Sequence, residues 1–230
     1  MTPDVHVKRA GLALPELPLG GLRYVLARDG LYLERRTDLY RTSTRIEGPL
    51  VGLVPHESRC ELGCARVPRI LSRVMLAFFE FAYRLHEGEA ALVLLYHPQR
   101  RLFRWHCPEQ TVEVYSSYGR LYAYDAIAFN LPLELPAGYI LLGDVHSHGD
   151  LGPHPSGIDE RDEAHSDGLH IIVGRIGRRG PPEYHVDFVM DRRRFHLAPE
   201  EVFEDATCRA LPRPPESWIK RIHMKRPRRW

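Results

Sequence analysis

The chain has 230 residues, 43% of them hydrophobic and 27% charged, which is ordinary for a globular protein with one large domain or a domain and a small appendage. A formal net charge of +2 excludes a strong field over the whole molecule, and no apolar run approaches the roughly 20 residues of a membrane span. This charge argues neither for nor against a nucleic-acid partner; we expect no nucleic acid and no membrane as a partner. Since the first residues lack the apolar block of a signal peptide, we expect a cytoplasmic protein.

Residues 1–65 are expected to form an N-terminal arm and a small β-rich unit. The first 20 residues are rich in proline and leucine without periodicity, which indicates an extended arm. Strand-like runs then flank turns that contain glycine, at 22–27, 31–34, 42–46 and 50–54. The four cysteines are too few and too scattered for a disulfide framework, so we expect reduced thiols; a metal site at the pair Cys60 and Cys64 is the alternative.

Residues 66–210 are expected to form the main domain, of the α/β class. Apolar residues at helical spacing predict a helix over 70–85 that ends near Gly88. Runs of apolar and β-branched residues predict strands at 90–96, 102–106, 111–115, 139–145, 169–176 and 184–190. Residues 120–129 fit either a helix or a strand, and one or two helical turns are expected at 159–166. Residues 211–230 are expected to form a basic C-terminal tail.

The most specific pattern is His146-Ser147-His148, followed by Ser156 and Asp159. At an extended strand end, residues two apart point to the same side, so both histidines can reach one ion while Ser147 faces away. A glycine-containing loop can fold back and return Asp159 as a third, anionic ligand. If a helix begins at Ser156, Ser156 and Asp159 share a face and Ser156 can also cap the helix. Two imidazoles and a carboxylate are the donor set of a catalytic zinc site with an open position for water.

This segment resembles the JAMM motif of the MPN/JAB-domain metalloproteases, in which an upstream glutamate is followed by His-x-His, seven residues, serine, two residues and aspartate. His146, His148, Ser156 and Asp159 match the motif in register. The usual proline after the second histidine is Gly149 here, as in certain prokaryotic JAB proteins.

The resemblance covers roughly residues 66–196 and implies the cytidine-deaminase-like JAB/MPN fold, a central mixed β-sheet flanked by helices. In this family the glutamate lies at the start of the strand that follows the first long helix. Glu89 leads directly into that strand, whereas Glu87 lies at the helix end. We expect Glu89 to be the family's glutamate, with Glu87 as the alternative; the family's glycine-containing continuation of the strand is absent here.

The resemblance also implies a role for each residue. Zn²⁺ held by His146, His148 and Asp159 would lower the pKa of its bound water from about 15.7 toward ~7. Glu89 would take the proton as general base and return it to the leaving amine. Ser156 would donate a hydrogen bond to the oxyanion of the tetrahedral intermediate.

Other polar residues are expected to have simpler roles. Asp144, Asp150 and Asp162 can orient the ligating imidazoles, but charges on a loop or a helix face are the simpler interpretation. The histidines expected to be structural or at the surface are His97, His106, His170 and His185.

The function implied by the resemblance is that of a zinc metallopeptidase of the deubiquitinase-like branch. It would cleave a ubiquitin-like protein from its conjugate or C-terminal extension, with E1-like and E2-like enzymes of the same pathway as further partners. The start of the motif and the strand pair after it also resemble the JAB proteins called PRTRC system protein A, and both relatives indicate a bacterial protein. The alternatives are a JAB hydrolase that acts on a small amide or a sulfur-carrier protein, and a catalytically silent JAB scaffold.

Overall fold

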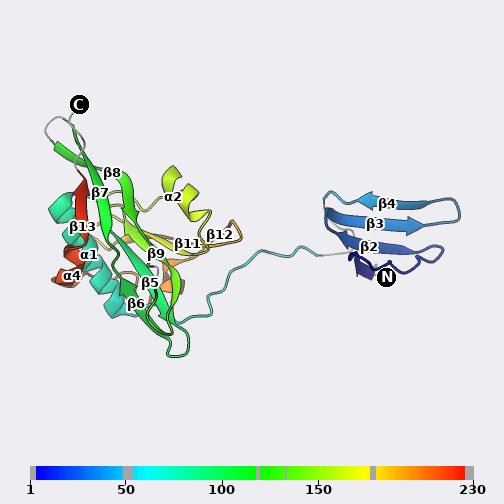
Figure 1. Ribbon diagram of the computed structural model, residues 1–230, viewed down its shortest axis with the longest axis horizontal. Helices are drawn as coiled ribbons and strands as arrows, with labels where there is room; N and C mark the ends of the chain where they lie inside the picture. The colour runs from blue at the N-terminus through cyan, green and yellow to red at the C-terminus, as the bar shows by residue number, and fades with distance from the viewer. Residues whose placement is uncertain (1–3, 49–53, 118–119, 133, 177–179, 226–230) are drawn as a thin grey trace. The chain divides into compact units, whose positions relative to one another are not determined.

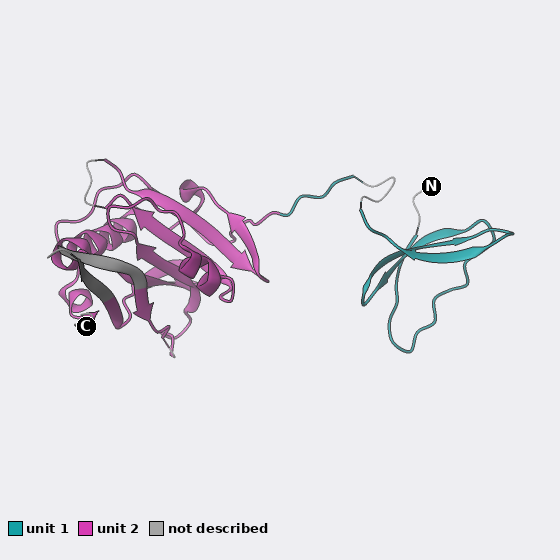
Figure 2. Cartoon of the chain, turned by 90° about the horizontal axis from the view of Figure 1, so that it is seen from above, with its two compact units in different colours: residues 1–58 teal, residues 59–230 magenta. Residues whose placement is uncertain are grey.

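The computed structural model describes residues 4–48, 54–117, 120–132, 134–176 and 180–225, with the backbone alone for 113–126. The chain divides into two compact units, residues 1–58 and 59–230 (Figure 2). Among the described residues, no helix combines the length and the hydropathy that a membrane crossing needs.

The first unit contains a four-stranded sheet in the order β1-β2-β3-β4 (Figure 1). Its strands are β1 (Asp4–Val7), β2 (Leu22–Ala27), β3 (Gly30–Arg36) and β4 (Arg41–Arg45). The β2–β3 hairpin lies where the turn with Gly30 predicts it. The run expected at 42–46 is a strand, but it pairs with β3 across residues 37–40, a turn that the sequence analysis does not predict. β1 pairs with β2 in parallel, within the segment that the sequence indicates as an arm. Of the strand expected at 50–54, only Val54 lies within the described residues.

The second unit is built on a six-stranded sheet in the order β12-β11-β10-β9-β5-β6. Its strands are β5 (Ala91–His97), β6 (Leu102–His106), β9 (Ile140–Ser147), β10 (Gly168–Gly174), β11 (Glu183–Met190) and β12 (Arg193–His196). Only the β9–β10 pair is parallel, so the sheet is mixed. The predicted α/β class is confirmed.

A smaller sheet in the order β13-β7-β8 lies in the same unit. Its strands are β7 (Gln110–Ser117), β8 (Arg120–Phe129) and β13 (Ile222–Lys225). Pairing with β7 resolves the ambiguity of residues 120–129 in favour of a strand. Part of the segment expected as a basic tail is ordered too: α4 (Glu216–Ile219) is followed by β13, and Ile222 belongs to the buried core.

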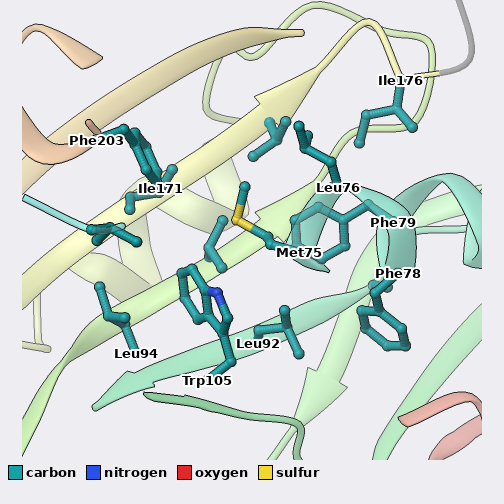
Figure 3. Close-up of a cluster of buried hydrophobic side chains, with 14 of the residues drawn as sticks. Met75, Leu76, Phe78, Phe79, Leu92, Leu94, Trp105, Ile171, Ile176 and Phe203 are labelled. Carbon is teal, nitrogen blue, oxygen red and sulfur yellow. The ribbon is translucent and has the colours of Figure 1, made fainter. Parts of the chain in front are cut away.

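Helix α1 (Arg69–His86) supplies one side of the core. Its apolar residues recur at helical spacing, and it ends where Glu87 adopts a left-handed conformation with φ 50°. Figure 3 shows Met75, Phe78 and Phe79 of this helix among the buried side chains that pack on the sheet. The core residues of the sheet include Leu92, Leu94, Val145, Leu169, Ile171, Val173 and Val186.

The opposite face of the sheet carries a group of polar side chains. Side chains alternate along a strand, so the neighbours of the core residues in β9, β10 and β11 point away from α1. The strand register brings this second set together across the sheet. We call it the polar face; its members are Asp144, His146, His170, His185, Asp187 and His196. Helix α2 (Gly157–Glu163) lies on this side, away from α1 (Figure 1).

Candidate metal centre

Strand β9 delivers the two motif histidines to the polar face. The Nε2 atoms of His146 and His148 lie 3.1 Å apart. The backbone N–H of His148 donates to the carbonyl of Val173 at 2.9 Å, which keeps the chain extended just past the end of the strand. Both imidazoles therefore reach one point, as the alternation of side chains predicts.

Ser147 faces away from the two histidines, as predicted, and has a buried partner. Its Oγ accepts a hydrogen bond from the backbone N–H of Ala90 at 3.1 Å, and its own N–H donates to the carbonyl of Ala90 at 3.0 Å. These two bonds tie the end of β9 to the residue that follows Glu89. No local pattern of the sequence indicates this contact, because Ala90 and Ser147 are 57 positions apart.

The loop after the histidines depends on Gly149. This residue has φ +55°, a value that proline, fixed near −65°, cannot adopt. A Cβ placed on Gly149 would lie 2.6 Å from the ring of Tyr83. The loop geometry therefore explains why this chain lacks a proline at the position where the resemblance leads one to expect it.

Helix α2 holds Ser156 and Asp159 in a capping box. Ser156 is the N-cap, and its Oγ accepts from the backbone N–H groups of Ile158 and Asp159 at 3.3 Å each. Asp159 Oδ2 in turn accepts from the N–H of Ser156 at 2.7 Å. The helix begins two residues before the predicted range because the cap lies at Ser156. The Ser156 side chain also hydrogen-bonds the Asp159 carboxylate, and since a carboxylate only accepts, the hydroxyl is the donor in that bond.

The capping box aims the Asp159 carboxylate at the two histidines. Oδ1 lies 3.4 Å from the Nε2 of His146, and Oδ2 lies 3.6 Å from the Nε2 of His148. Ligand atoms around a tetrahedral zinc ion lie roughly 3.3 Å apart, given bond lengths of about 2.0–2.1 Å. The imidazole and carboxylate donors thus fit Zn²⁺ in both chemistry and spacing.

Glu89 lies beside this donor set, whereas Glu87 does not. Glu89 Oε1 is 4.0 Å from the Nε2 of His148, and its residue is 8% exposed. Glu87 is the exposed C-cap of α1 and does not line the cleft around the histidines. The β5–β9 register, which pairs Ala91 with His146, accounts for the position of Glu89.

The local electrostatics differ among the three donors. Burial lowers the pKa of His146, so its imidazole is neutral, as a ligand must be. Burial lowers the pKa of His148 too, but the hydrogen bond to Asp159 and the charge of Glu89 outweigh burial and leave it raised. Burial raises the pKa of Asp159, yet the contacts with His148 and His146 outweigh it and hold the carboxyl well below its usual range.

An open cleft of about 830 Å³ gives access to the site. One side carries Glu89, His146 and Asp159, and another side carries the apolar residues Ile127 and Phe129 at the end of β8. The cleft is thus polar at the donor set and apolar beside it.

Asp144 has a different partner from the one considered in the sequence analysis. Its Oδ2 lies 2.8 Å from the Nδ1 of His170, which is 3% exposed, while the Nε2 of His170 lies 2.7 Å from the carbonyl of Ser166. Alternation from His146 places Asp144 on the polar face, but only the β9–β10 register reveals His170 beside it.

Comparison with known proteins identifies the family. The family model described as prokaryotic homologs of the JAB domain matches residues 71–193, more than half of the chain. That range contains Glu89 and all four downstream motif residues. Neither the search of curated proteins nor that of solved structures found a match. The chain belongs to the prokaryotic homologues of the JAB domain.

Proposed function

We propose that this chain is a zinc-dependent isopeptidase or peptidase that cleaves a ubiquitin-like protein from its conjugate or C-terminal extension. The observation that carries the proposal is the convergence of Glu89, His146, His148 and Asp159 at one place, where Ser156 caps the helix that holds Asp159. Glu89, His146 and Asp159 also line one cleft. Membership of a family that includes metalloproteases supports it.

The chemistry assigns a distinct task to each group. His146, His148 and Asp159 would hold Zn²⁺, which would supply Lewis acidity and a water with its pKa lowered toward ~7. Glu89 accepts the proton of the attacking water and returns it to the leaving amine, which is a poor leaving group until it is protonated. The hydroxyl of Ser156 donates to the oxyanion that forms on the scissile carbonyl.

The cleft fits an extended polypeptide. β8 is an edge strand of its sheet, and its residues Ile127 to Phe129 line the cleft. An extended C-terminal tail laid against such an edge adds backbone hydrogen bonds to side-chain contacts, as in β-augmentation. The ubiquitin-like protein is therefore the proposed partner, and E1-like and E2-like enzymes of the same pathway are further proposed partners.

The test uses the zinc-loaded chain and a ubiquitin-like protein fused at its C-terminus to a reporter. We expect release of the reporter that stops on addition of a chelator. Glu89→Gln should lower the release rate by at least 10²-fold while zinc stays bound, because the amide cannot accept the proton. Glu87→Gln is the matched control and should keep both the zinc and the rate.

Three outcomes contradict the proposal. Normal cleavage by Glu89→Gln removes the assigned base. Failure of the zinc-loaded chain to release the reporter favours hydrolysis of a small amide or a sulfur-carrier protein. Purified protein without stoichiometric zinc favours a catalytically silent scaffold.

A further inference from the structure

A second group of metal-binding side chains lies on the polar face, apart from the centre described above. His185 and Asp187 are two residues apart on β11, and His196 at the end of β12 pairs with Asp187 in the strand register. Residues two apart on a strand, and residues paired across strands, point to the same side of a sheet. The three side chains therefore gather at one place.

Both imidazoles direct a ring nitrogen at the Asp187 carboxylate, one to each oxygen. His185 Nε2 lies 2.9 Å from Oδ2, and His196 Nδ1 lies 3.1 Å from Oδ1. The centroids of the two rings are 4.9 Å apart. One donor atom of each of the three residues lies within 4.8 Å of the other two. Small side-chain rotations would bring these atoms to the roughly 3.3 Å spacing of tetrahedral zinc ligands.

The charge of the cluster also favours a cation. Asp187 is 2% exposed, and a buried carboxylate needs compensation. Arg194 donates to Asp187 Oδ2 at 2.8 Å but also to Glu163, so its single positive charge is shared between two carboxyl groups. Burial raises the pKa of Asp187, yet the hydrogen bonds from Arg194 and His185 outweigh it, so the carboxyl stays anionic as a ligand must.

The carboxylate has room for both partners. Each carboxylate offers about four lone-pair sites, and the contact with Arg194 uses Oδ2. Oδ1 of Asp187 contacts His196 Nδ1, and an ion bound by both groups would replace that hydrogen bond. A hydrogen bond from Arg194 to a ligating carboxylate is the kind of outer contact that orients metal ligands in proteins.

We propose that His185, Asp187 and His196 form a second divalent metal site, of the class that takes Zn²⁺, with a fourth position open to solvent. Two nitrogen ligands and one carboxylate suit borderline metals better than Ca²⁺ or Mg²⁺, which prefer oxygen ligands. His196, with 66% of its side chain exposed, gives the ion an entry route.

The position of the site indicates a structural role. Ile172 of β10 pairs with His146 on one side and with His185 on the other. The two ligand rows are thus two strand spacings apart, about 10 Å, whereas two-metal catalytic sites hold their ions roughly 3.5–4 Å apart. A metal held between β11 and β12 would cross-link the edge of the six-stranded sheet. The inference stands independently of the proposed function.

The experiment counts bound zinc in the full chain. Protein stripped with a chelator is dialysed against Zn²⁺, and bound zinc per chain is measured by mass spectrometry. We expect two equivalents for the wild type, one for His148→Ala, one for His196→Ala and none for the double variant. His223→Ala is the matched control, since His223 is 60% exposed and has a single carboxylate partner, Glu109; it should keep two equivalents.

A second measurement guards against misfolding. His196→Asn keeps a side chain that can hydrogen-bond Asp187 but lacks the imidazole ligand, so it should also bind one equivalent. In chelator, the melting temperature of His196→Asn should match that of the wild type. Addition of Zn²⁺ should raise the melting temperature of the variant by less than that of the wild type. One equivalent in the wild type, lost on His148→Ala and unchanged in His196→Ala, overturns the inference. Two equivalents that persist in His196→Ala and His196→Asn overturn it as well and would direct attention to Cys60 and Cys64.

Discussion

Strand β9 shows how differently the two faces of the central sheet are built. Val145 is fully buried against the core that α1 covers, whereas Asp144 and His146, one residue away on either side, point to the cleft. The apolar face depends on buried area, which is non-directional and tolerates change of shape within limits. The polar face depends on directed contacts between donors and acceptors. Alternate residues of one strand thus control stability and chemistry separately.

The largest expected effect tests the apolar face alone. Phe79→Ala removes a fully buried ring and should lower the free energy of unfolding by about 3–5 kcal/mol, measured by urea denaturation in chelator. Leu85→Ala, on the same helix but 56% exposed, should change it by less than about 0.5 kcal/mol. Zinc bound per folded molecule should be unchanged in both. A loss of zinc by folded Phe79→Ala would show that the two faces are not separable.

The next effect tests the polar face and rests on the proposed function. Ser156→Ala removes the oxyanion donor and should lower kcat/KM by about 10²–10³-fold, with zinc retained. It also removes the N-cap of α2, which should cost about 1 kcal/mol of stability. Ser156→Thr keeps the hydroxyl and should retain most of the activity and most of the stability. Equal activity in the alanine and threonine variants would rule out the donor role.

Ser147→Ala sharpens the comparison between the two faces. Ser147 lies between His146 and His148 in the chain, but its side chain points to the other face of the sheet and contacts Ala90. The change leaves the buried N–H of Ala90 without its acceptor, which should cost about 1–3 kcal/mol. We expect kcat to fall while KM and zinc content hold, since Ser147 positions Glu89 and does not touch the metal. Ser43→Ala, at an exposed strand position, is the control. Loss of zinc in Ser147→Ala would refute a positioning role.

The smallest expected effect concerns the loop that connects the polar face to α2. Gly149→Ala places a Cβ at φ +55° and close to Tyr83, and should destabilise the chain by about 1–2 kcal/mol. Gly157→Ala, at the first position of α2 with nothing within 4 Å, should be neutral or slightly stabilising. Thermal melts of the two variants check the difference; equal melting temperatures would argue against strain at Gly149.

Local patterns were sufficient to predict much of the fold, and together with the family resemblance they predicted that His146, His148 and Asp159 lie close together. The periodicity of α1, the strand-like runs of the sheet and the capping of α2 by Ser156 are each encoded within a few turns or residues. The His146 to Asp159 segment also lies within a single strand, loop and helix. Patterns of this length predict the local secondary structure of a segment and the face on which each side chain lies.

Contacts that depend on strand register could not be predicted. Residues 120–129 become a strand only by pairing with β7, and β13 forms from a segment that reads as a basic tail. His185 appeared to be an ordinary surface histidine because Asp187 and His196 become its neighbours only when β11 and β12 pair. The alternation of side chains shows which face of a sheet a residue is on, but only the strand register shows which residues of other strands lie beside it.

The bond between Ser147 and Ala90 has a consequence for how the centre assembles. The three metal donors span 13 positions of sequence, while Glu89 is 57 positions from His146. Holding the longer segment closed costs roughly 1 kcal/mol more in chain entropy, and it requires β5 to be paired with β9. In a partly denatured chain, the metal donors should therefore stay close together after Glu89 has separated from them. As the urea concentration is raised, hydrolysis should cease before zinc is released. The zinc content would then exceed the number of catalytically active molecules, which active-site titration measures directly.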